Sequence, residues 1–523
     1  MKKRYILPLV ALLGMGTACE DFLDKEPLAK ETSANFYNDP ANAELAVNGI
    51  YDALQRDTDP FHHQFWMFGD VRSDDAVKGS SDSDLPELKA IENFEATNTN
   101  LIGLAAWEYG YRIVSRANSV LEGLDSSPAE ESKKARLIGE AKFLRAFGYF
   151  HLVRIFGEVP VFTKTIAPSE YRTQTRASEQ ETFNQIIKDL TEAIELLPLN
   201  YDAANIGRAT KGAAKAYLSR VLMYTMKLEA NDNQENWQTV YNQTKDIINS
   251  GEYALLGNYA QLFEMEGENS VESIFEIQFV NQNSSGDFYG DKNDGTHSTI
   301  FQGIRPIDWS DQRYTGWGFN SPTQSLHDAF ETNDPRQKST IYEFGDGILL
   351  YGNDLEIFLS ESGGTGFSNR KAQVAPEQKA PQSESPVNTR KMRYADVLLM
   401  HAEAAYNLGF EGEARDYVNM IRDRARRSTK PYGATLNGDL SYSSDVIGGA
   451  LPALTNQSGI ELRDAIWHER RVELGMEALR YFDIVRQRRA RAVLNAYKDG
   501  LGDKWENQPF VPIPQQDEQW LGM

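Results

Sequence analysis

Apolar residues recur every three to four positions over long stretches of this chain, which is the spacing of one face of an amphipathic helix. Two local signals agree with this pattern. Ser178 stands three residues before Glu181, as in a capping box, and Gly157 follows a long helical run. The pattern predicts a mainly α-helical fold. The predicted helices span about residues 40–56, 101–124, 130–156, 178–197, 210–228, 236–250, 391–408, 411–427 and 460–489.

Several predicted helices form hairpins. Residues 393–425 contain two helical runs separated by Leu408 and Gly409, with alanines where the two helices have to approach closely. Such a pair buries its apolar faces only by stacking on its neighbours, as in tetratricopeptide repeats. The spacing between pairs is irregular, so we expect a TPR-like scaffold of helical hairpins rather than a regular array. Two further pairs are predicted at 210–228 with 236–250 and at 130–156 with 178–197.

Residues 251–390 have a different pattern. Short β-branched and aromatic runs, such as ESIFEIQFV at 272–280, stand among Gly, Asn, Asp and Ser. These runs predict short strands in an irregular, loop-rich subdomain, and residues 362–390 are predicted to be mostly mobile surface. We therefore expect a single domain at 40–523, with a helical scaffold at about 40–250 and 391–523.

The composition narrows the possible partners. Of the 523 residues, 41% are hydrophobic and 25% charged, and the formal net charge is −22. Nucleic-acid affinity depends mostly on Lys and Arg that neutralise phosphates, so we expect no nucleic-acid partner. The charge suits a neutral or cationic ligand, or simple solubility.

The first residues resemble an export signal. A basic start is followed by the apolar stretch Tyr5–Leu13 and by small residues up to Ala18, which predicts a signal peptide at 1–18. Cys19, the only cysteine, is then either an incidental free thiol or an acylated terminus that anchors the chain to a membrane. We favour lipidation of Cys19, with 19–39 as a tether. The acidic pair after it resembles the signal that sends some lipoproteins to the outer face of the outer membrane.

Catalytic and metal-binding motifs are not matched. The segment WHERRV at 467–472 begins like a zincin helix, but Val472 occupies the place of the second histidine. The acidic and basic residues of the helix at 460–489 are better explained as ion pairs than as catalytic groups. DKNDGT at 291–296 only partly resembles a calcium loop. We expect no enzymatic activity, no cofactor and no metal site.

Aromatic residues in two segments without helical periodicity are the candidate ligand contacts. A sugar ring places its C–H face on a flat aromatic ring, while Asp, Asn and Arg side chains bind its hydroxyls. The alternative is that these tryptophans only fill gaps in the core, as we expect for Trp107. The predicted glycan-binding residues are Phe65, Trp66, Asp70, Arg72, Asp74, Trp309, Tyr314 and Trp317.

Several motifs, in order along nearly the whole chain, resemble the SusD/RagB family of outer-membrane glycan-binding lipoproteins. Two examples are AKFLRAFGYFHLVRIFGEVPVF at 141–162 and RYADVLLMHAEAAYNLG at 393–409. One departure is Ala478, where the family often has glycine. The other matching segments are 19–27, 209–225, 316–336, 469–486 and 511–518.

The resemblance implies an α-rich fold whose irregular subdomain, here about 251–390, carries the ligand site. It also implies a surface-exposed lipoprotein that binds oligosaccharide without cleaving it and passes it to a SusC-like TonB-dependent transporter. Two other hypotheses stay open. One is a TPR-type scaffold or peptide-binding surface lipoprotein. The other, which we rank last, is a hydrolase that uses acidic residues of the segment 70–75.

Overall fold

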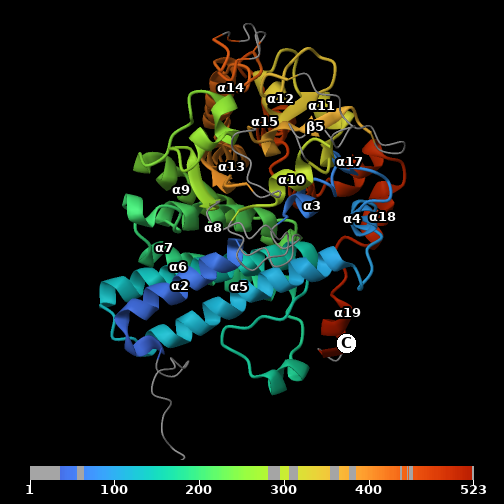
Figure 1. Ribbon diagram of the computed structural model, residues 1–523. Coiled ribbons are helices and arrows are strands. Elements are labelled where there is room, and N and C mark those ends of the chain that lie inside the picture. Colours follow the sequence, from blue (N-terminus) through green and yellow to red (C-terminus); the bar gives the residue numbers. More distant parts are fainter. Residues whose placement is uncertain are drawn as a thin grey trace, which may run out of the picture.

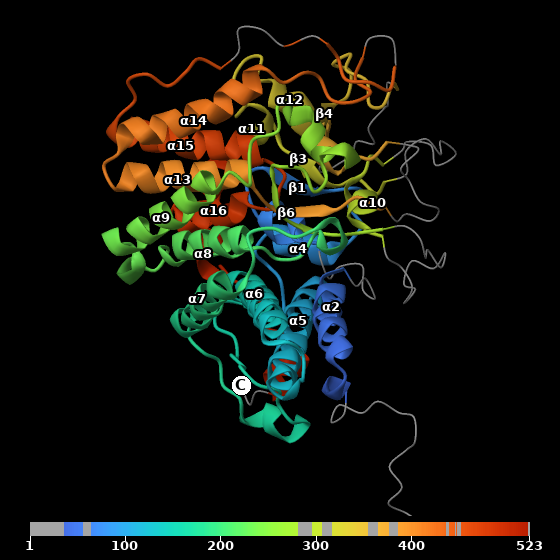
Figure 2. The ribbon, with the colours of Figure 1, turned by 90° about the vertical axis from the view of Figure 1, so that its left-hand side faces the viewer.

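The computed structural model describes residues 36–55, 64–280, 295–305, 316–353, 364–375, 385–435, 439–444, 446 and 451–520. Its long helices stack side by side in one curved layer, and each packs against the next along the layer (Figures 1 and 2). The mainly α, TPR-like fold predicted from the sequence is confirmed. The long helices are α2 (Pro40–Gln55), α5 (Leu101–Ser126), α6 (Glu131–Phe156), α7 (Glu179–Leu196), α8 (Lys211–Thr225), α9 (Gln234–Ser250), α13 (Tyr394–Asn407), α14 (Glu411–Arg426) and α15 (Gly459–Leu474).

Local sequence explains where these helices begin. The predicted capping box is present before α7, where the Ser178 side chain accepts the Glu181 N–H and the Glu181 carboxylate accepts the Ser178 N–H. Thr210 caps α8 by accepting the Ala213 N–H at 3.0 Å. The predicted hairpin partners α6 with α7, α8 with α9 and α13 with α14 are in contact.

The core runs along α5 and α6, and α6 is almost entirely buried from Leu137 onward. The two helices approach closely at Gly110, where an added Cβ would lie 2.5 Å from Leu152 Cγ. A larger residue at this position would force the helices apart. Trp107, also on α5, is 5% exposed and packs on Phe156, which confirms that it belongs to the core.

In the part of the chain that the structure describes, three small antiparallel sheets lie beside the helical layer. Strand β1 (Ala76–Gly79) pairs with β3 (Phe319–Pro322), and β4 (Ile341–Glu343) pairs with β5 (Phe367–Asn369). Strand β2 (Ser273–Ile277), which the sequence predicted, pairs with β6 (Thr389–Arg393). In each sheet, the two strands are separated by a long stretch of sequence, so the sheets join distant parts of the chain.

The structure corrects two predictions. The helix predicted at 460–489 is two helices, α15 and α16 (Arg480–Arg486), separated by Gly475–Leu479. Met476 and Ala478 have φ values of 62° and 61° in this break, which no helix accommodates. Residues 364–375 are not mobile surface, because they contain β5 and are largely buried.

Shorter helices complete the described part of the chain. The α-helices are α3 (Trp66–Gly69), α4 (Pro86–Glu92), α10 (Ser298–Gln302), α11 (Gln324–His327), α12 (Pro335–Thr340), α17 (Ala490–Tyr497), α18 (Leu501–Asn507) and α19 (Gln515–Trp520). The 3₁₀ helices are η1 (Phe36–Asn38), η2 (Pro168–Thr173), η3 (Ala203–Asn205), η4 (Glu229–Asn231), η5 (Tyr259–Phe263), η6 (Met265–Gly267) and η7 (Arg370–Ala372).

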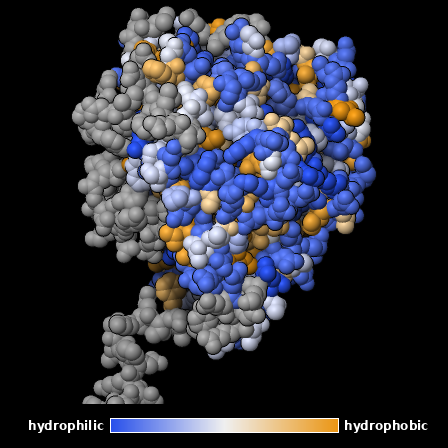
Figure 3. Space-filling model, turned by 90° about the vertical axis from the view of Figure 1, so that its right-hand side faces the viewer, coloured by the Kyte–Doolittle hydropathy of each residue, from blue (hydrophilic) through white to orange (hydrophobic). Residues whose placement is uncertain are grey.

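The surface is polar. The face shown in Figure 3 is mostly hydrophilic, with hydrophobic residues scattered over it. Exposed large hydrophobic residues such as Leu45 and Ile460 come from separate elements. Within the ranges that the structure covers, no helix is both long and apolar enough to cross a membrane.

Candidate functional site

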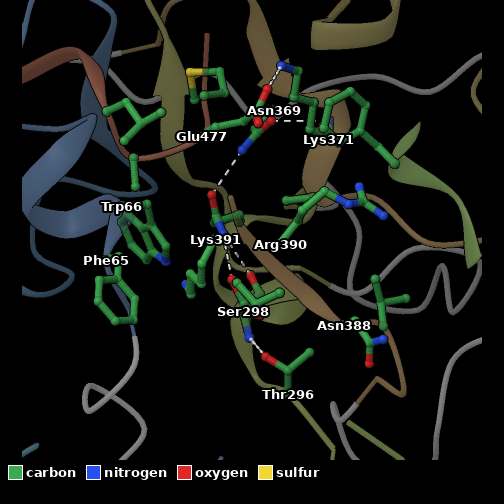
Figure 4. Close-up of a pocket in the computed structure, with 18 of the residues that line it drawn as sticks. Phe65, Trp66, Thr296, Ser298, Asn369, Lys371, Asn388, Arg390, Lys391 and Glu477 are labelled. Atoms are coloured by element: carbon green, nitrogen blue, oxygen red, sulfur yellow. Dashed lines mark hydrogen bonds and ion pairs between the residues drawn. The ribbon is translucent and has the colours of Figure 1, made fainter. Parts of the chain in front are cut away.

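A pocket of about 160 Å³ opens where the helical layer meets the small sheets. Its lining comes from both halves of the chain, and side chains from opposite walls converge on it (Figure 4). The pocket therefore forms only when these distant segments are assembled. The lining elements include α3, α6, α8, η5, α10, β5, η7, β6 and the segment between α15 and α16.

Phe65 and Trp66 form an aromatic wall of this pocket (Figure 4). Trp66 begins the single turn α3, which packs so closely on the segment after α15 that a Cβ on Gly69 would lie 2.0 Å from the Ala478 carbonyl oxygen. The indole N–H of Trp66 donates to Gln64 Oε1 at 2.6 Å. These contacts hold the two rings in place, with 9% of Phe65 and 5% of Trp66 exposed.

Amide and hydroxyl groups form a second wall. Gln302 Nε2 donates to Ser298 Oγ at 2.7 Å, and Gln302 Oε1 accepts from Asn369 Nδ2 at 2.9 Å. Just before β6, the backbone N–H of Asn388 donates to Glu268 Oε1 at 2.7 Å. Groups that both donate and accept can bind the hydroxyls of a polar, uncharged ligand.

Most charged groups of the pocket are paired. Lys371 Nζ lies 2.8 Å from Glu477 Oε1, and Arg390 Nε lies 2.6 Å from Glu276 Oε1. Burial lowers the pKa of Lys371 to about 8 and raises the pKa of Glu268 to about 7. Lys391, on the same strand as Arg390, also faces the pocket (Figure 4).

Asp70, a predicted ligand residue, lies below the pocket and is completely buried. Its carboxylate accepts the Ala478 N–H at 2.9 Å and Asn320 Nδ2 at 3.2 Å. Burial raises the pKa of Asp70 to about 7. The side chain thus supports the floor of the pocket, while the atoms that line the pocket belong to other residues.

Arg72 and Asp74, two further predicted ligand residues, have partners within the fold. The Arg72 guanidinium lies between the rings of Phe94 and Tyr481, at 4.7 and 4.5 Å from their centres. The carboxylate of Asp74 accepts from Arg480 Nε at 2.8 Å. Both side chains are buried, and neither lines the pocket.

The second predicted segment is described only in part. Trp317 is half-buried, and its ring packs edge-on against Phe301, with the ring centres 4.7 Å apart. Phe301 in turn contacts the Trp66 ring at 6.2 Å, so Trp317 stands behind the aromatic wall. Trp309 and Tyr314 lie outside the described residues, as do Cys19 and most of the calcium-like segment at 291–296.

Several lining residues were not predicted from the sequence. Asn369 and Lys371 fall in the segment that was predicted to be mobile surface, and Lys391 was placed at the start of a helix. The segment TRKMR at 389–393 has no apolar–polar alternation, because only Met392 is apolar, so no local signal predicts a strand there. Other unpredicted polar lining residues include Thr296, Ser298, Thr299, Gln302 and Asn388.

Two of the carboxylates that line the pocket are held in ion pairs. Glu264 pairs with Arg370 at 2.8 Å, and Glu477 pairs with Lys371 and Arg393. Within the described ranges, no group of three or more His, Cys, Asp or Glu side chains could hold a metal ion. The arrangement is suited to binding polar groups beside an aromatic surface.

A second hollow, of about 640 Å³, lies between α5, residues 160–166 and α19. Trp107 and Tyr111 line it, with ring centres 4.8 Å apart. None of the predicted ligand residues that the structure covers contributes to this hollow. The smaller pocket is the better candidate because it combines the predicted aromatic pair with convergent polar groups.

Two family models together match most of the chain. One, described as starch-binding and associating with the outer membrane, matches residues 21–223, and the SusD family model matches residues 271–518. The chain belongs to the SusD/RagB family. It is 27% identical to SusD-like protein P38 of Formosa agariphila in an alignment of 499 residues that covers 92% of this chain and 90% of that protein.

Solved structures share the fold. A laminarin-binding SusD-like protein matches with a TM-score of 0.74 and 27% identity, over 92% of this chain and 97% of that one. Surface glycan-binding protein A from Bacteroides thetaiotaomicron, solved with laminarihexaose, has a TM-score of 0.73 at 23% identity, again over 92% and 97% of the two chains.

Proposed function

We propose that this protein binds an oligosaccharide without cleaving it, and that part of the sugar occupies the pocket beside Phe65 and Trp66. The observation that carries the proposal is the pairing of an aromatic wall with amide and hydroxyl groups such as Ser298 and Asn388. Family membership supports it, as does the likeness to a laminarin-binding protein. Two of the lining carboxylates are held in ion pairs and the third, Glu268, accepts the Asn388 N–H, so the pocket favours binding over bond cleavage.

The proposal includes a place in the cell. Cys19 carries a lipid that anchors the chain to the outer face of the outer membrane, and the bound sugar passes to a SusC-like TonB-dependent transporter. The description of the first family model, which mentions the outer membrane, supports the location. The lone cysteine with its acidic neighbours supports the anchor.

Isothermal titration calorimetry against a panel of plant, host and microbial oligosaccharides tests the binding. We expect one class of glycan to bind, and Trp66→Ala to weaken that binding about tenfold or more because it removes a ring from the wall. Asn388→Ala, on the polar wall, is a milder second variant. The matched control is Trp505→Ala, whose half-buried indole donates to Tyr481 Oη outside the pocket.

The binding proposal fails if no glycan of the panel binds to the folded chain. It also fails if Trp66→Ala and Asn388→Ala both bind the ligand as tightly as the wild type. Near-ultraviolet circular dichroism of each variant separates a lost contact from a lost fold.

The anchor and the transporter need their own experiment. We expect Cys19→Ser to move the protein from the membrane fraction to the soluble fraction of the host cell while glycan binding is kept. Affinity purification of the wild-type chain from solubilised outer membranes should recover a TonB-dependent barrel. Recovery of no barrel under conditions that keep the chain folded would contradict the transporter partner.

A further inference from the structure

The ammonium group of Lys391 is a feature of the pocket that binding of a neutral sugar does not use. Its Nζ lies 3.8 Å from the centre of the Phe65 ring and faces the space between the two walls (Figure 4). Among the residues that the structure covers, Lys391 Nζ has no ion pair and no hydrogen bond. Two other cationic side chains of the pocket lining, Lys371 and Arg390, are both paired with carboxylates.

Two arginines line the pocket beside Lys391. The Arg154 guanidinium is stacked between the rings of Phe150 and Phe482, at 4.1 and 4.2 Å, and its Nε donates to the Phe150 carbonyl oxygen at 3.1 Å. In the described part of the chain, no carboxylate pairs with Arg154. Arg220 donates to the Lys391 carbonyl oxygen at 2.8 Å and pairs with Asp396.

On this side of the pocket, Lys391 and the two arginines thus have a single ion-pair partner, Asp396, which pairs with Arg220. The next acid, Asp70, is buried beneath the pocket with its own hydrogen bonds. Burial, together with the charges of Arg154 and Arg220, lowers the pKa of Lys391 well below its ordinary value. An ammonium in this position is stabilised when an anion enters the pocket.

We propose that the bound saccharide is acidic and that its anionic substituent, a carboxylate or a sulfate ester, pairs with Lys391. This inference rests on the proposed function and names the class of its ligand. The anionic group lies against Lys391 and Arg154, and the hydroxyls of the sugar face the polar wall at Ser298 and Thr299.

The net charge of −22 does not oppose this assignment. Surface charges act through a screening length of about 8 Å in physiological salt, whereas a contact inside a pocket is screened much less. The local excess of positive charge at Lys391 and Arg154 therefore determines which ligand the pocket prefers. It overrides the expectation, drawn from the whole composition, of a neutral or cationic ligand.

Calorimetry with matched oligosaccharides tests the ligand class. The probes are oligogalacturonates and sulfated galactan oligosaccharides, each with its carboxyl-reduced or desulfated counterpart. We expect one acidic oligosaccharide to bind, and we expect the affinity of its neutral counterpart to be lower by a factor of at least about 30. Removing one partner of an enclosed charge pair has an effect of that size. The two acidic probes distinguish a carboxylate from a sulfate.

Variants of Lys391 assign the preference to this residue. Lys391→Gln should lose the preference for the acidic probe and keep whatever binding the neutral counterpart shows, while Lys391→Arg should retain the preference. The control is Lys504→Gln, which removes an exposed lysine paired with Glu95 outside the pocket. Equal affinity for acidic and neutral counterparts, or an unchanged preference in Lys391→Gln, overturns the inference.

A stability measurement provides a test that needs no ligand. Because Lys391 is an unpaired and partly buried cation, Lys391→Met should keep or raise the melting temperature of the free protein. A melting temperature lowered by about 5 °C or more would make Lys391 a structural residue and overturn the inference.

If no glycan binds at all, the proposed function fails. If only neutral glycans bind, and Lys391→Gln binds them equally well, the inference alone fails.

Discussion

At the scale of single residues, buried arginine–carboxylate contacts dominate the region around α15. Arg336 is fully buried and lies 2.7 Å from Asp334, 2.6 Å from Glu469 and 3.0 Å from Glu473. Glu473 also accepts from Arg393 at 2.6 Å. Each carboxylate is stabilised only while the arginines are present, because an uncompensated charge in the interior is strongly unfavourable.

Arg336→Met tests this dependence. The change leaves three buried carboxylates with fewer cations, and we expect the free energy of unfolding to fall by roughly 3–5 kcal/mol. Urea denaturation followed by circular dichroism measures the loss. Arg491→Met, which removes an exposed partner of Asp503, is the control and should leave the midpoint nearly unchanged. Equal midpoints for the two variants would contradict the role of Arg336.

Asp70 links stability to pH with an unusual sign. Its pKa is about 7 in the folded chain because of burial, against an ordinary value of 3.8. Asp75 raises this pKa further, while Asn320, the Ala478 N–H and Lys371 lower it. Between about pH 4 and 7, the Asp70 carboxyl is therefore protonated in the folded chain and ionised in the unfolded chain. The stability that the protonated carboxyl contributes is lost as the pH rises through 7.

Asp70→Asn removes this titration. Between about pH 4 and 8, we expect the stability of the variant to improve relative to the wild type by at most roughly 4 kcal/mol. Urea midpoints of both proteins across this range measure the difference. Asp499→Asn, at an exposed position, should run parallel to the wild type. A difference that does not change with pH would show that Asp70 is not protonated in the folded chain.

At the scale of elements, the sequence pattern predicted the long helices correctly but missed the break between α15 and α16. The apolar period locates the long helices to within a few residues because their burial follows the same period. The segment Gly475–Leu479 has helix-forming residues, yet it leaves the helical conformation. There the Ala478 N–H bonds to Asp70, and Glu477 pairs with Lys371. Contacts with distant segments decide this conformation, and a local pattern does not contain them.

Ala478→Gly tests the strain in this break. Ala478 has a φ of 61°, a left-handed conformation that glycine adopts without steric cost. We expect the variant to be more stable by about 0.5–1 kcal/mol, as measured by its urea midpoint. The same exchange inside α13, Ala404→Gly, should lower stability by about 1 kcal/mol or more. A destabilised Ala478→Gly would mean that the break is not strained.

The candidate site was predictable only in part, for the same reason. Phe65 and Trp66 stood out as aromatic residues in a segment without helical period, and they line the pocket. Arg72 and Asp74 have equally suitable chemistry, but Asp74 pairs with Arg480, 406 positions away. The sequence does not show which polar side chains are already paired within the fold. Lys391 went unnoticed because its strand precedes a strongly helical run.

At the scale of the whole molecule, the two segments matched by the family models form one body. The residues after α3 bond to those around α16, and β1 pairs with β3. Near the end of the chain, the Val511 N–H donates to the Ile155 carbonyl oxygen at 2.9 Å, and the Gln515 N–H donates to the Asn98 carbonyl oxygen at 2.8 Å. Neither half can therefore complete its core without the other.

We expect the chain to unfold in a single cooperative transition. In differential scanning calorimetry, the calorimetric and van't Hoff enthalpies should agree, and a fragment ending at residue 250 should lack near-ultraviolet circular dichroism. Arg480→Gln, which cuts the contact with Asp74, should lower the melting temperature of the whole transition without splitting it.

Because the pocket has walls from both halves, a bound glycan at 100 times its Kd should stabilise the entire fold by about 2.7 kcal/mol. Two separate transitions, of which the ligand shifts only one, would contradict this, since binding would then need only one half.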